Sequence, residues 1–316
     1  MIEYLLFALG FVLLLKGADY LVDGASALAG KMGVSKLVVG LTVVAFGTSM
    51  PELVVNIIAA TGGTGDVALG TVIGSNLSNI LLIFGIAALI YPPKMQHSTV
   101  WKEIPFSLLA VLVLFVLAND FLIDGNEIFS LTRTDGLMML FFFLIFLYYL
   151  FGMFQNGDGQ KTEVSMGNGR MAGLILLGMV GLYLGGKWTV EGAVFIARNL
   201  SISEFTISAV IVALGTSLPE LVTSVRAAMR KDADLAVGNI VGSNIFNIFL
   251  VLGVTASISP VSIPGFLNVD LAFLSFATLL LFAFMFIGRR YLLEKWEGVV
   301  FLIFYAAYVA MLFLRG

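Results

Sequence analysis

Two glutamates lie within apolar stretches of the chain, and each ends the same short motif. Glu52 closes the segment GTSMPE at residues 47–52, and Glu220 closes GTSLPE at residues 215–220. A carboxylate at the depth of a bilayer is costly unless it is paired or hydrated, so it indicates a functional site. A protonated glutamate bonded between helices is the structural alternative. The repetition of the motif favours function.

A second pair of segments supplies neutral oxygen atoms. In each, a serine and an asparagine stand four residues apart, which places them on one helix face. They are Ser75 and Asn79 in residues 70–79, and Ser243 and Asn247 in residues 238–247. The neighbouring Asn76 and Asn244 point elsewhere, and we expect them to bond between helices. Asp66 and Asp234, just ahead of these segments, are interpreted as helix N-caps.

The prolines of the two motifs should disturb the helices that carry them. Pro51 and Pro219 lack a backbone N–H and clash with the carbonyls of Gly47 and Gly215, four residues earlier. Irregular backbone at membrane depth is tolerated where it faces protein or a water-filled cavity. A packing kink patched by hydroxyl groups would explain the prolines but not the glutamates. The freed carbonyls are therefore further candidate ligands.

The resulting set of ligands consists of oxygen alone. The chain has no cysteine, and its one histidine, His97, follows the loop Pro92–Gln96 and is expected to be solvated. Carboxylate, hydroxyl, amide and carbonyl oxygens suit hard cations such as Ca²⁺ and Na⁺ and serve soft metals poorly. Mg²⁺ ranks lower because it needs a tight octahedron and loses water reluctantly.

The composition predicts an integral membrane protein. Of 316 residues, 59% are hydrophobic and 12% are charged, and the net charge of −3 does not suggest nucleic acid. A soluble core of this size could not hide that much apolar surface. Ten nearly uncharged runs are candidate membrane spans: residues 2–15, 37–46, 77–91, 104–118, 137–151, 171–186, 205–214, 245–258, 271–287 and 298–314.

An internal duplication divides the chain into two halves. Residues 47–80 align with residues 215–248 at a constant offset of 168 (215 − 47), and 17 of the 34 pairs are identical. Each half has five spans, so the second half must enter the membrane from the opposite side. The predicted fold is an all-α integral membrane protein with ten transmembrane helices in two inverted five-helix repeats. The predicted boundaries are 1–154 for the first repeat, 155–170 for a linker and 171–316 for the second repeat.

The basic residues predict the orientation. Twelve fall on one side when the loops are numbered alternately: Lys31, Lys36, Lys94, Lys102, Lys161, Arg170, Arg226, Arg230, Lys231, Arg289, Arg290 and Lys295. Only Arg133, Arg198 and Arg315 fall on the other side, and Lys16 and Lys187 lie inside or at the ends of spans. The positive-inside rule then predicts a multi-pass protein of the cell membrane, with a cytoplasmic linker and both termini outside.

The paired motifs resemble the two alpha-repeats of the sodium/calcium exchanger group of the calcium/cation antiporter superfamily. The specific match lies within residues 41–82 and 209–250, and the general arrangement in two repeats resembles the family over the whole chain. It implies a secondary antiporter that exchanges Ca²⁺ for Na⁺ by alternating access at a midplane site. It also implies that the two long helices that begin the repeats slide during transport.

The resemblance implies a set of twelve ion-binding residues. Glu52 and Glu220 would bind calcium. The rest would supply hydroxyl, amide or main-chain oxygens: Thr48, Thr216, Ser49, Ser217, Ser75, Ser243, Asn79, Asn247, Ala45 and Ala213. Asn247 departs from relatives with aspartate there, which leaves sodium stoichiometry and potassium involvement open.

Other functions could use some of the same residues. A proton-coupled or potassium-dependent exchanger would use the same carboxylates. A channel would use the same oxygens without a counter-ion, but proline-broken inverted repeats favour a carrier. A membrane enzyme is not supported, because the sequence shows no Ser/His pair and no paired aspartates that could form a catalytic site. The expected partners are Ca²⁺ and Na⁺ as substrates and the lipid bilayer, with no cofactor and no obligatory protein partner.

Overall fold

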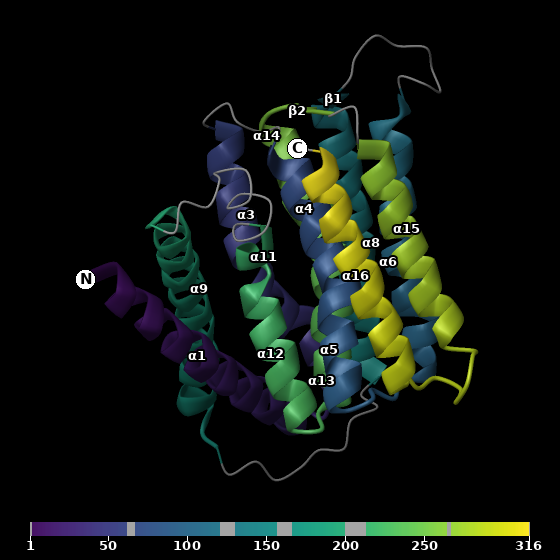
Figure 1. Cartoon of the computed structure of the whole chain (residues 1–316). Coiled ribbons are helices and arrows are strands. Elements are labelled where there is room, and N and C mark those ends of the chain that lie inside the picture. The colour runs from purple at the N-terminus through teal and green to yellow at the C-terminus, as the bar shows by residue number, and fades with distance from the viewer. Residues whose placement is uncertain are drawn as a thin grey trace.

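The computed structural model describes residues 2–61, 67–120, 130–156, 166–199, 213–263 and 267–315, and these ranges are almost wholly helical (Figure 1). The first half contains the following elements, of which η1, η2 and η3 are π-helical turns: α1 (Ile2–Met32), α2 (Lys36–Val39), η1 (Gly40–Val44), α3 (Ala45–Thr61), α4 (Val67–Leu77), η2 (Ser78–Ile83), α5 (Phe84–Ile90), η3 (Thr99–Glu103), α6 (Ile104–Ala118), β1 (Ser130–Leu131) and α8 (Arg133–Asn156).

The second half has a corresponding order with one π-helical turn, η5: α9 (Asn168–Asn199), α11 (Ala213–Thr216), α12 (Leu218–Met229), α13 (Ala233–Ile245), η5 (Phe246–Leu252), α14 (Gly253–Ile258), β2 (Val261–Ser262), α15 (Leu267–Phe284) and α16 (Lys295–Arg315). The strands form one short antiparallel ladder, in which Ser130 pairs with Ser262 and Leu131 with Val261.

Consecutive elements stack end to end into membrane-length helices. In the described ranges, nine such helices are long and apolar enough to cross a bilayer. The tenth position in the order belongs to α11 and α12. These helices are shorter than a membrane span because most of the predicted run 205–214, which precedes them, lies outside the described residues. The prediction of an all-helical membrane protein with ten helices is confirmed.

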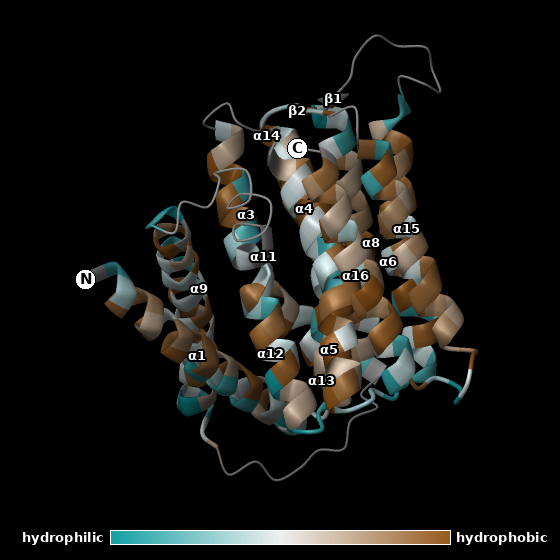
Figure 2. Cartoon of the chain, in the orientation of Figure 1, coloured by the Kyte–Doolittle hydropathy of each residue, from teal (hydrophilic) through white to brown (hydrophobic). Residues whose placement is uncertain are grey.

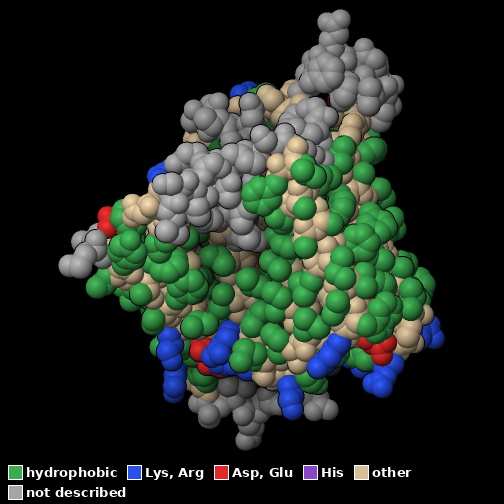
Figure 3. Space-filling model, in the orientation of Figure 1, with side chains coloured by type: hydrophobic (Ala, Val, Ile, Leu, Met, Phe, Trp, Pro, Cys, Tyr) green, Lys and Arg blue, Asp and Glu red, His purple; other side chains and the backbone are tan. Residues whose placement is uncertain are grey.

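The surface is apolar along the outward faces of the helices and polar toward their ends, as a bilayer requires. Hydrophobic residues cover the outward faces of α1, α15 and α16, and polar residues gather toward the ends of the helices (Figure 2). On the face drawn in Figure 3, most Lys and Arg side chains lie at the lower end. We call this end, which carries Lys36, Arg226 and Lys295, the basic end. These three residues belong to the set that the sequence assigns to one side of the membrane.

The helices α1 and α9 are longer than the apolar runs that predicted them. The runs 2–15 and 171–186 are the apolar parts of helices with 31 and 32 residues. Helix α1 continues through Lys16, Asp19 and Asp23 without interruption. The runs ended too early because they were bounded by charge, and charged residues are accommodated in helices near a membrane surface.

Glycines allow α1 and α9 to touch along their backbones. A Cβ added at Gly17 would lie 2.7 Å from the Leu182 nitrogen and 2.9 Å from the Gly178 oxygen. Gly10 lies against Gly185, and Gly24 lies against Ile175, so the two helices run antiparallel. Small residues permit this close packing in membranes. An antiparallel pair is what an inverted repeat predicts for the first helix of each half.

The apolar interior consists of two separate clusters. The main core joins the helices from η1 to α8 with those from α13 to α16. A smaller cluster is built around α1 and includes Leu21, Val22, Leu182 and Ala227. The α1–α9 pair lies at one edge of the molecule (Figure 1), so it packs on the bundle through its own contact surface.

Replacing Gly17 by Ala should destabilise this pair. The new methyl group meets backbone atoms that cannot rotate away, and overpacking of this kind costs about 1–3 kcal/mol. Gly173→Ala, in the same helix pair, has nothing within 4 Å of the added carbon and should be neutral or slightly stabilising. Thermal unfolding in detergent should separate the variants. Equal melting temperatures for G17A and G173A would contradict the packing described.

Candidate functional site

The two predicted carboxylates are fully buried, and they come from both halves of the chain. Glu52 lies in α3 and is 0% exposed, and Glu220 lies in the first turn of α12 and is 1% exposed. The Ser49 hydroxyl, one turn before Glu52, donates to Glu220 Oε1 at 3.2 Å. This bond joins the two motifs, as the duplication predicts.

The two prolines have different effects on their helices. In the second half the helix stops at Thr216, turns at Ser217 and resumes at Leu218, as expected for a proline-disturbed helix. In the first half, α3 continues through Pro51, so the expected break is wrong there. The Thr48 hydroxyl donates to the Ala45 carbonyl at 3.3 Å. The carbonyl that Pro51 leaves without its helical donor is that of Gly47, which therefore stays a candidate ligand.

Hydroxyl pairs link the motifs in a repeated manner. Thr48 and Ser243 share a hydrogen bond of 3.3 Å, and Ser75 and Thr216 share one of the same length. The two pairs are related by the 168-residue offset of the duplication. Each pair therefore takes one member from each half, and Ser75 and Ser243 lie beside the glutamate motifs as predicted.

Four asparagines form a buried lattice between the halves. Asn79 Nδ2 donates to Asn244 Oδ1 at 2.9 Å, and Asn247 Nδ2 donates to Asn76 Oδ1 at 3.1 Å. Asn76 Nδ2 donates to the Asn244 backbone oxygen at 3.2 Å, which confirms the expected bonding between helices. These bonds fix the amide nitrogens of Asn79 and Asn247, so the Oδ1 atoms are left to accept other ligands.

Six buried oxygens of the predicted set have no hydrogen-bond donor. They are Glu52 Oε1 and Oε2, Glu220 Oε2, Ser217 Oγ, Asn79 Oδ1 and Asn247 Oδ1. Buried polar atoms are nearly always satisfied, so such a concentration requires a physical reason. Calcium takes six to eight oxygen ligands in flexible geometry, and sodium is also a hard cation. These oxygen ligands fit either ion.

The last two predicted residues would contribute main-chain atoms. Ala45 follows the π-helical turn η1, and its carbonyl already accepts the Thr48 hydroxyl. Ala213 begins α11 and belongs to the short helix that carries Thr216. The structure therefore places both alanines one turn before the threonines of their motifs.

Asn239 contacts the site but was missed from the sequence. Its Oδ1 accepts the Thr48 hydroxyl at 3.0 Å, and its Nδ2 donates to Ser224 Oγ at 2.9 Å. The residue at the equivalent position of the first repeat is Thr71. A comparison of identical residues in the two repeats does not select Asn239. Its position four residues before Ser243, on the same predicted helix, is the signal that could have identified it.

The proposed cap at Asp234 is wrong. Asp234 lies inside the first turn of α13 and accepts a hydrogen bond from Gln96 Nε2 at 2.8 Å. The N-cap position belongs to Asp232, which forms an ion pair with Lys36. The corresponding interpretation of Asp66 falls outside the described residues.

A cavity of about 310 Å³ lies beside the glutamate motifs. Its lining includes Pro51, Val55, Gly186, Thr216 and Pro219, from α3, α9, α11 and α12. Helix α3 extends from the middle of the molecule toward the end opposite the basic end (Figure 1). The cavity thus borders the two motifs through Pro51, Thr216 and Pro219.

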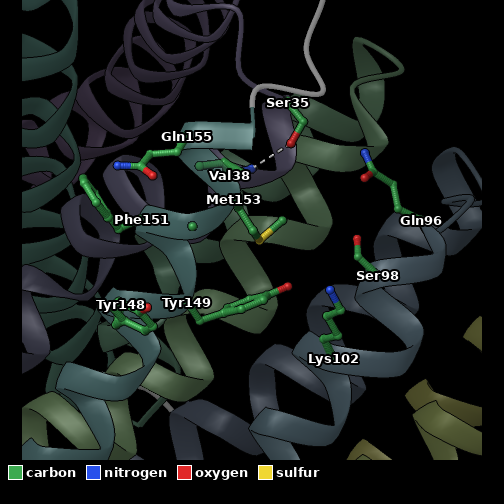
Figure 4. A pocket seen from close by; sticks show the side chains of 11 residues that line it. Ser35, Val38, Gln96, Ser98, Lys102, Tyr148, Tyr149, Phe151, Met153 and Gln155 are labelled. Atoms are coloured by element: carbon green, nitrogen blue, oxygen red, sulfur yellow. Dashed lines mark hydrogen bonds between the residues drawn. The ribbon is translucent and has the colours of Figure 1, made fainter.

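A larger cavity of about 510 Å³ lies elsewhere and contains none of the predicted site residues (Figure 4). Lys102 and Tyr149 are part of its wall, and the Lys102 ammonium lies 5.8 Å from the Tyr149 ring centroid. The Tyr149 hydroxyl donates to the buried Glu103. A lysine in the wall repels cations, so this cavity is a poor cation site.

The inverted helical architecture and the buried oxygens define a membrane carrier of cations. A family model described as sodium/calcium exchanger protein matches residues 2–152 and 171–314. The chain belongs to this family, and it is a multi-pass membrane transporter rather than an enzyme.

Three relatives illustrate the similarity. The sodium/calcium exchanger MaX1 of Methanosarcina acetivorans is 34% identical over 348 aligned positions that cover 99% of both chains. The inner membrane protein YrbG of Escherichia coli is 36% identical over 81% of this chain and 79% of its own. A solved structure of the sodium-calcium exchanger NCX_Mj superposes with a TM-score of 0.82 at 31% identity, covering 98% of each chain.

Removing the Asn244 side chain should destabilise the lattice. Asn244→Leu takes away the acceptor of Asn79 Nδ2, and leaving a buried donor unsatisfied costs about 1–3 kcal/mol. Ser275→Ala is a suitable control because Ser275 donates only to the carbonyl of Leu271 in its own helix, at 2.8 Å. Chemical unfolding in detergent without added Ca²⁺ should show a clear loss for N244L alone. Similar stability of both variants would contradict the lattice.

Proposed function

We propose that the protein exchanges Ca²⁺ for Na⁺ across the membrane by alternating access. The ions would bind between the halves, at Glu52 and Glu220 and the neutral oxygens around them. The names of MaX1 and NCX_Mj as sodium/calcium exchangers support this substrate pair, as do crystals of NCX_Mj soaked with Na⁺, Ca²⁺ or Sr²⁺.

The observation that carries the proposal is the charge of the site. Two buried carboxylates have three oxygens without a donor, and no described ion pair involves either glutamate. In the described residues, no group of three or more His, Cys, Asp or Glu side chains is gathered that would suit another metal. Two ionised carboxylates would balance the charge of one Ca²⁺, and the neutral oxygens would complete its shell.

The same charge explains why transport would be an exchange. An empty site with two ionised carboxylates is expensive to enclose in a dry protein interior. Bound Ca²⁺, or Na⁺ in its place, would offset that cost and allow the protein to change its open side. The return step would therefore require a counter-ion, and an uncoupled leak would be slow.

The identity of the counter-ion depends on this site. Hydroxyls next to both glutamates favour sodium, whereas buried carboxylates could instead carry protons. Asn247 is neutral, so the site has one potential negative charge fewer than relatives with aspartate. A proton-coupled or potassium-dependent exchanger is the alternative that the flux experiment must separate.

The domain boundaries and the orientation remain part of the proposal. We assign residues 1–154 and 171–316 to the two repeats, and 155–170 to a cytoplasmic linker. The basic end would face the cytoplasm and both termini would lie outside.

Calcium flux into proteoliposomes tests the proposed coupling. Vesicles loaded with sodium should take up ⁴⁵Ca²⁺, and matched vesicles loaded with potassium, choline or an acid interior should not. Uptake driven by internal acid would replace sodium by protons as the coupling ion. Calcium entry without any counter-ion would instead indicate a channel.

Glu52→Gln and Glu220→Gln should each abolish calcium exchange while the protein stays folded. Each change removes a charge and one of the oxygens available to the ion. Glu103→Gln is a matched control because Glu103 is also fully buried but lies at the Tyr149 contact, outside the site. Flux and size-exclusion profiles should be measured together. Exchange at the parental rate in E52Q and E220Q would refute the assignment.

Single cysteines can test the orientation, since the chain has none of its own. Thr134 lies at the end opposite the basic end. The thiol introduced by Thr134→Cys should react with an impermeant maleimide in intact cells. Lys295→Cys, at the basic end, should react only after permeabilisation. Both residues are exposed. The reverse pattern would invert the proposed topology.

A further inference from the structure

Charged side chains connect α1 to the helix that carries Glu220. The Arg226 guanidinium binds Asp19 in two places: Nε donates to Oδ1 at 2.8 Å, and Nη2 donates to Oδ2 at 2.7 Å. Arg230 Nη2 also donates to Asp19 Oδ1 at 2.8 Å, and Arg230 pairs with Asp23. We call these four residues the α1–α12 ion-pair cluster.

The α1–α12 ion-pair cluster is partly shielded from solvent, which strengthens its ion pairs. The side chain of Asp19 is 15% exposed, and that of Arg226 is 29% exposed. Bidentate pairs between Arg and a carboxylate have fixed geometry and are stronger than single contacts between mobile surface charges. An apolar contact tolerates sliding, whereas a bidentate pair is made or broken. The cluster therefore gives the α1–α9 pair one discrete position on α12.

A second link holds the same end of α1. Ser26 Oγ donates to Asp232 Oδ2 at 3.4 Å, and Asp232 forms an ion pair with Lys36 at the start of α2. Val22 and Ala29 of α1 are buried at this level, as is Ala227 of α12. The basic end is thus closed where α1 meets α12.

At the opposite end, the residues that the repeat places at these positions cannot form the corresponding pair. Shifting by 168 residues places Lys187 at the position of Asp19, and Ile58 at the position of Arg226. Helix α3 contains no charged residue besides Glu52, so it has no counterpart of Arg226. Lys187 instead lies 3.9 Å from Glu191 within α9, and both side chains are more than half exposed. The 310 Å³ cavity lies at this end, with Lys187 in its wall.

The cluster is also mechanically close to the ion site. Glu220 and Arg226 belong to the same helix, six residues or roughly 9 Å apart along its axis. A helix of this length moves as one body, so a change at Arg226 reaches the turn that carries Glu220. Breaking the pairs would free α1 from the helix that supplies one of the carboxylates.

We propose that Asp19, Asp23, Arg226 and Arg230 act as positioning residues that hold the transporter closed at the basic end. Because the repeat-related residues Lys187 and Ile58 cannot form such a cluster at the other end, the two access states have unequal energies, and the state closed at the basic end is favoured. This inference deepens the proposed function and rests on it only in giving the α1–α9 pair a role in alternating access.

Cysteine reactivity in the full-length protein tests the inference. Val22→Cys reports on the closed end, and Val55→Cys reports on the cavity at the other end. Each is introduced alone into the cysteine-free chain and labelled with a water-soluble maleimide in detergent, where the reagent reaches both ends. In Asp19→Asn or Arg226→Gln backgrounds, labelling at position 22 should rise about fivefold, the change expected for loss of a sheltered pair. Labelling at position 55 should fall.

Two controls separate ion pairing from general loosening. Asp19→Glu keeps the charge and should label like the parent. Lys187→Gln changes the repeat-related position at the other end and should leave position 22 unchanged. Unchanged labelling in D19N and R226Q would overturn the inference. So would equal increases at both reporter positions, or a response of D19E that matches D19N.

The labelling is done in potassium solution without Na⁺ or Ca²⁺, so it does not depend on the proposed substrates. A labelling shift without sodium-driven calcium flux would retain the cluster and reject the proposed exchange. Normal flux with no labelling shift would retain the exchange and reject the cluster.

Discussion

Two carboxylates buried away from water constrain the rest of this structure. Their charge cannot be offset by a nearby arginine or lysine without excluding cations, and no described ion pair joins either glutamate to a basic residue. The surroundings of Glu52 and Glu220 are instead neutral and polar. Hydroxyls, amides and carbonyls can solvate an ion without fixing a counter-charge. The composition of the two motifs follows from that requirement.

The duplication explains why the site lies between the halves. Each half supplies a carboxylate, a threonine, two serines and two asparagines, but the contacts cross from one half to the other. Thr48 meets Ser243, Ser75 meets Thr216, and Asn79 meets Asn244. Neither half can form these pairs alone. The same bonds that gather the ligands also hold the two repeats together, which couples stability of the bundle to the geometry of the site.

The sequence predicts the parts of this arrangement that depend on residue type and offset. The membrane fold, the inverted halves and the gathering of Glu220, Thr48, Ser49 and Ser243 follow from hydropathy and the repeat. Other features depend on packing between distant segments. Asn239 has no identical mate, and α3 continues through Pro51 whereas the helix that carries Pro219 is interrupted. The full length of α1 was hidden by Asp19 and Asp23, whose partners on α12 lie more than 200 positions away.

The two repeats agree near the buried carboxylates and differ at their ends, and this division has a physical basis. Both halves face the same buried polar centre, so equivalent positions supply the same kinds of oxygen. The ends meet different surroundings and are not bound by that requirement. There Asp19 corresponds to Lys187, and Arg226 corresponds to Ile58. A perfectly symmetric duplication would have made the two access states equal in energy. Charge differences outside the site can make them unequal without changing the ligands.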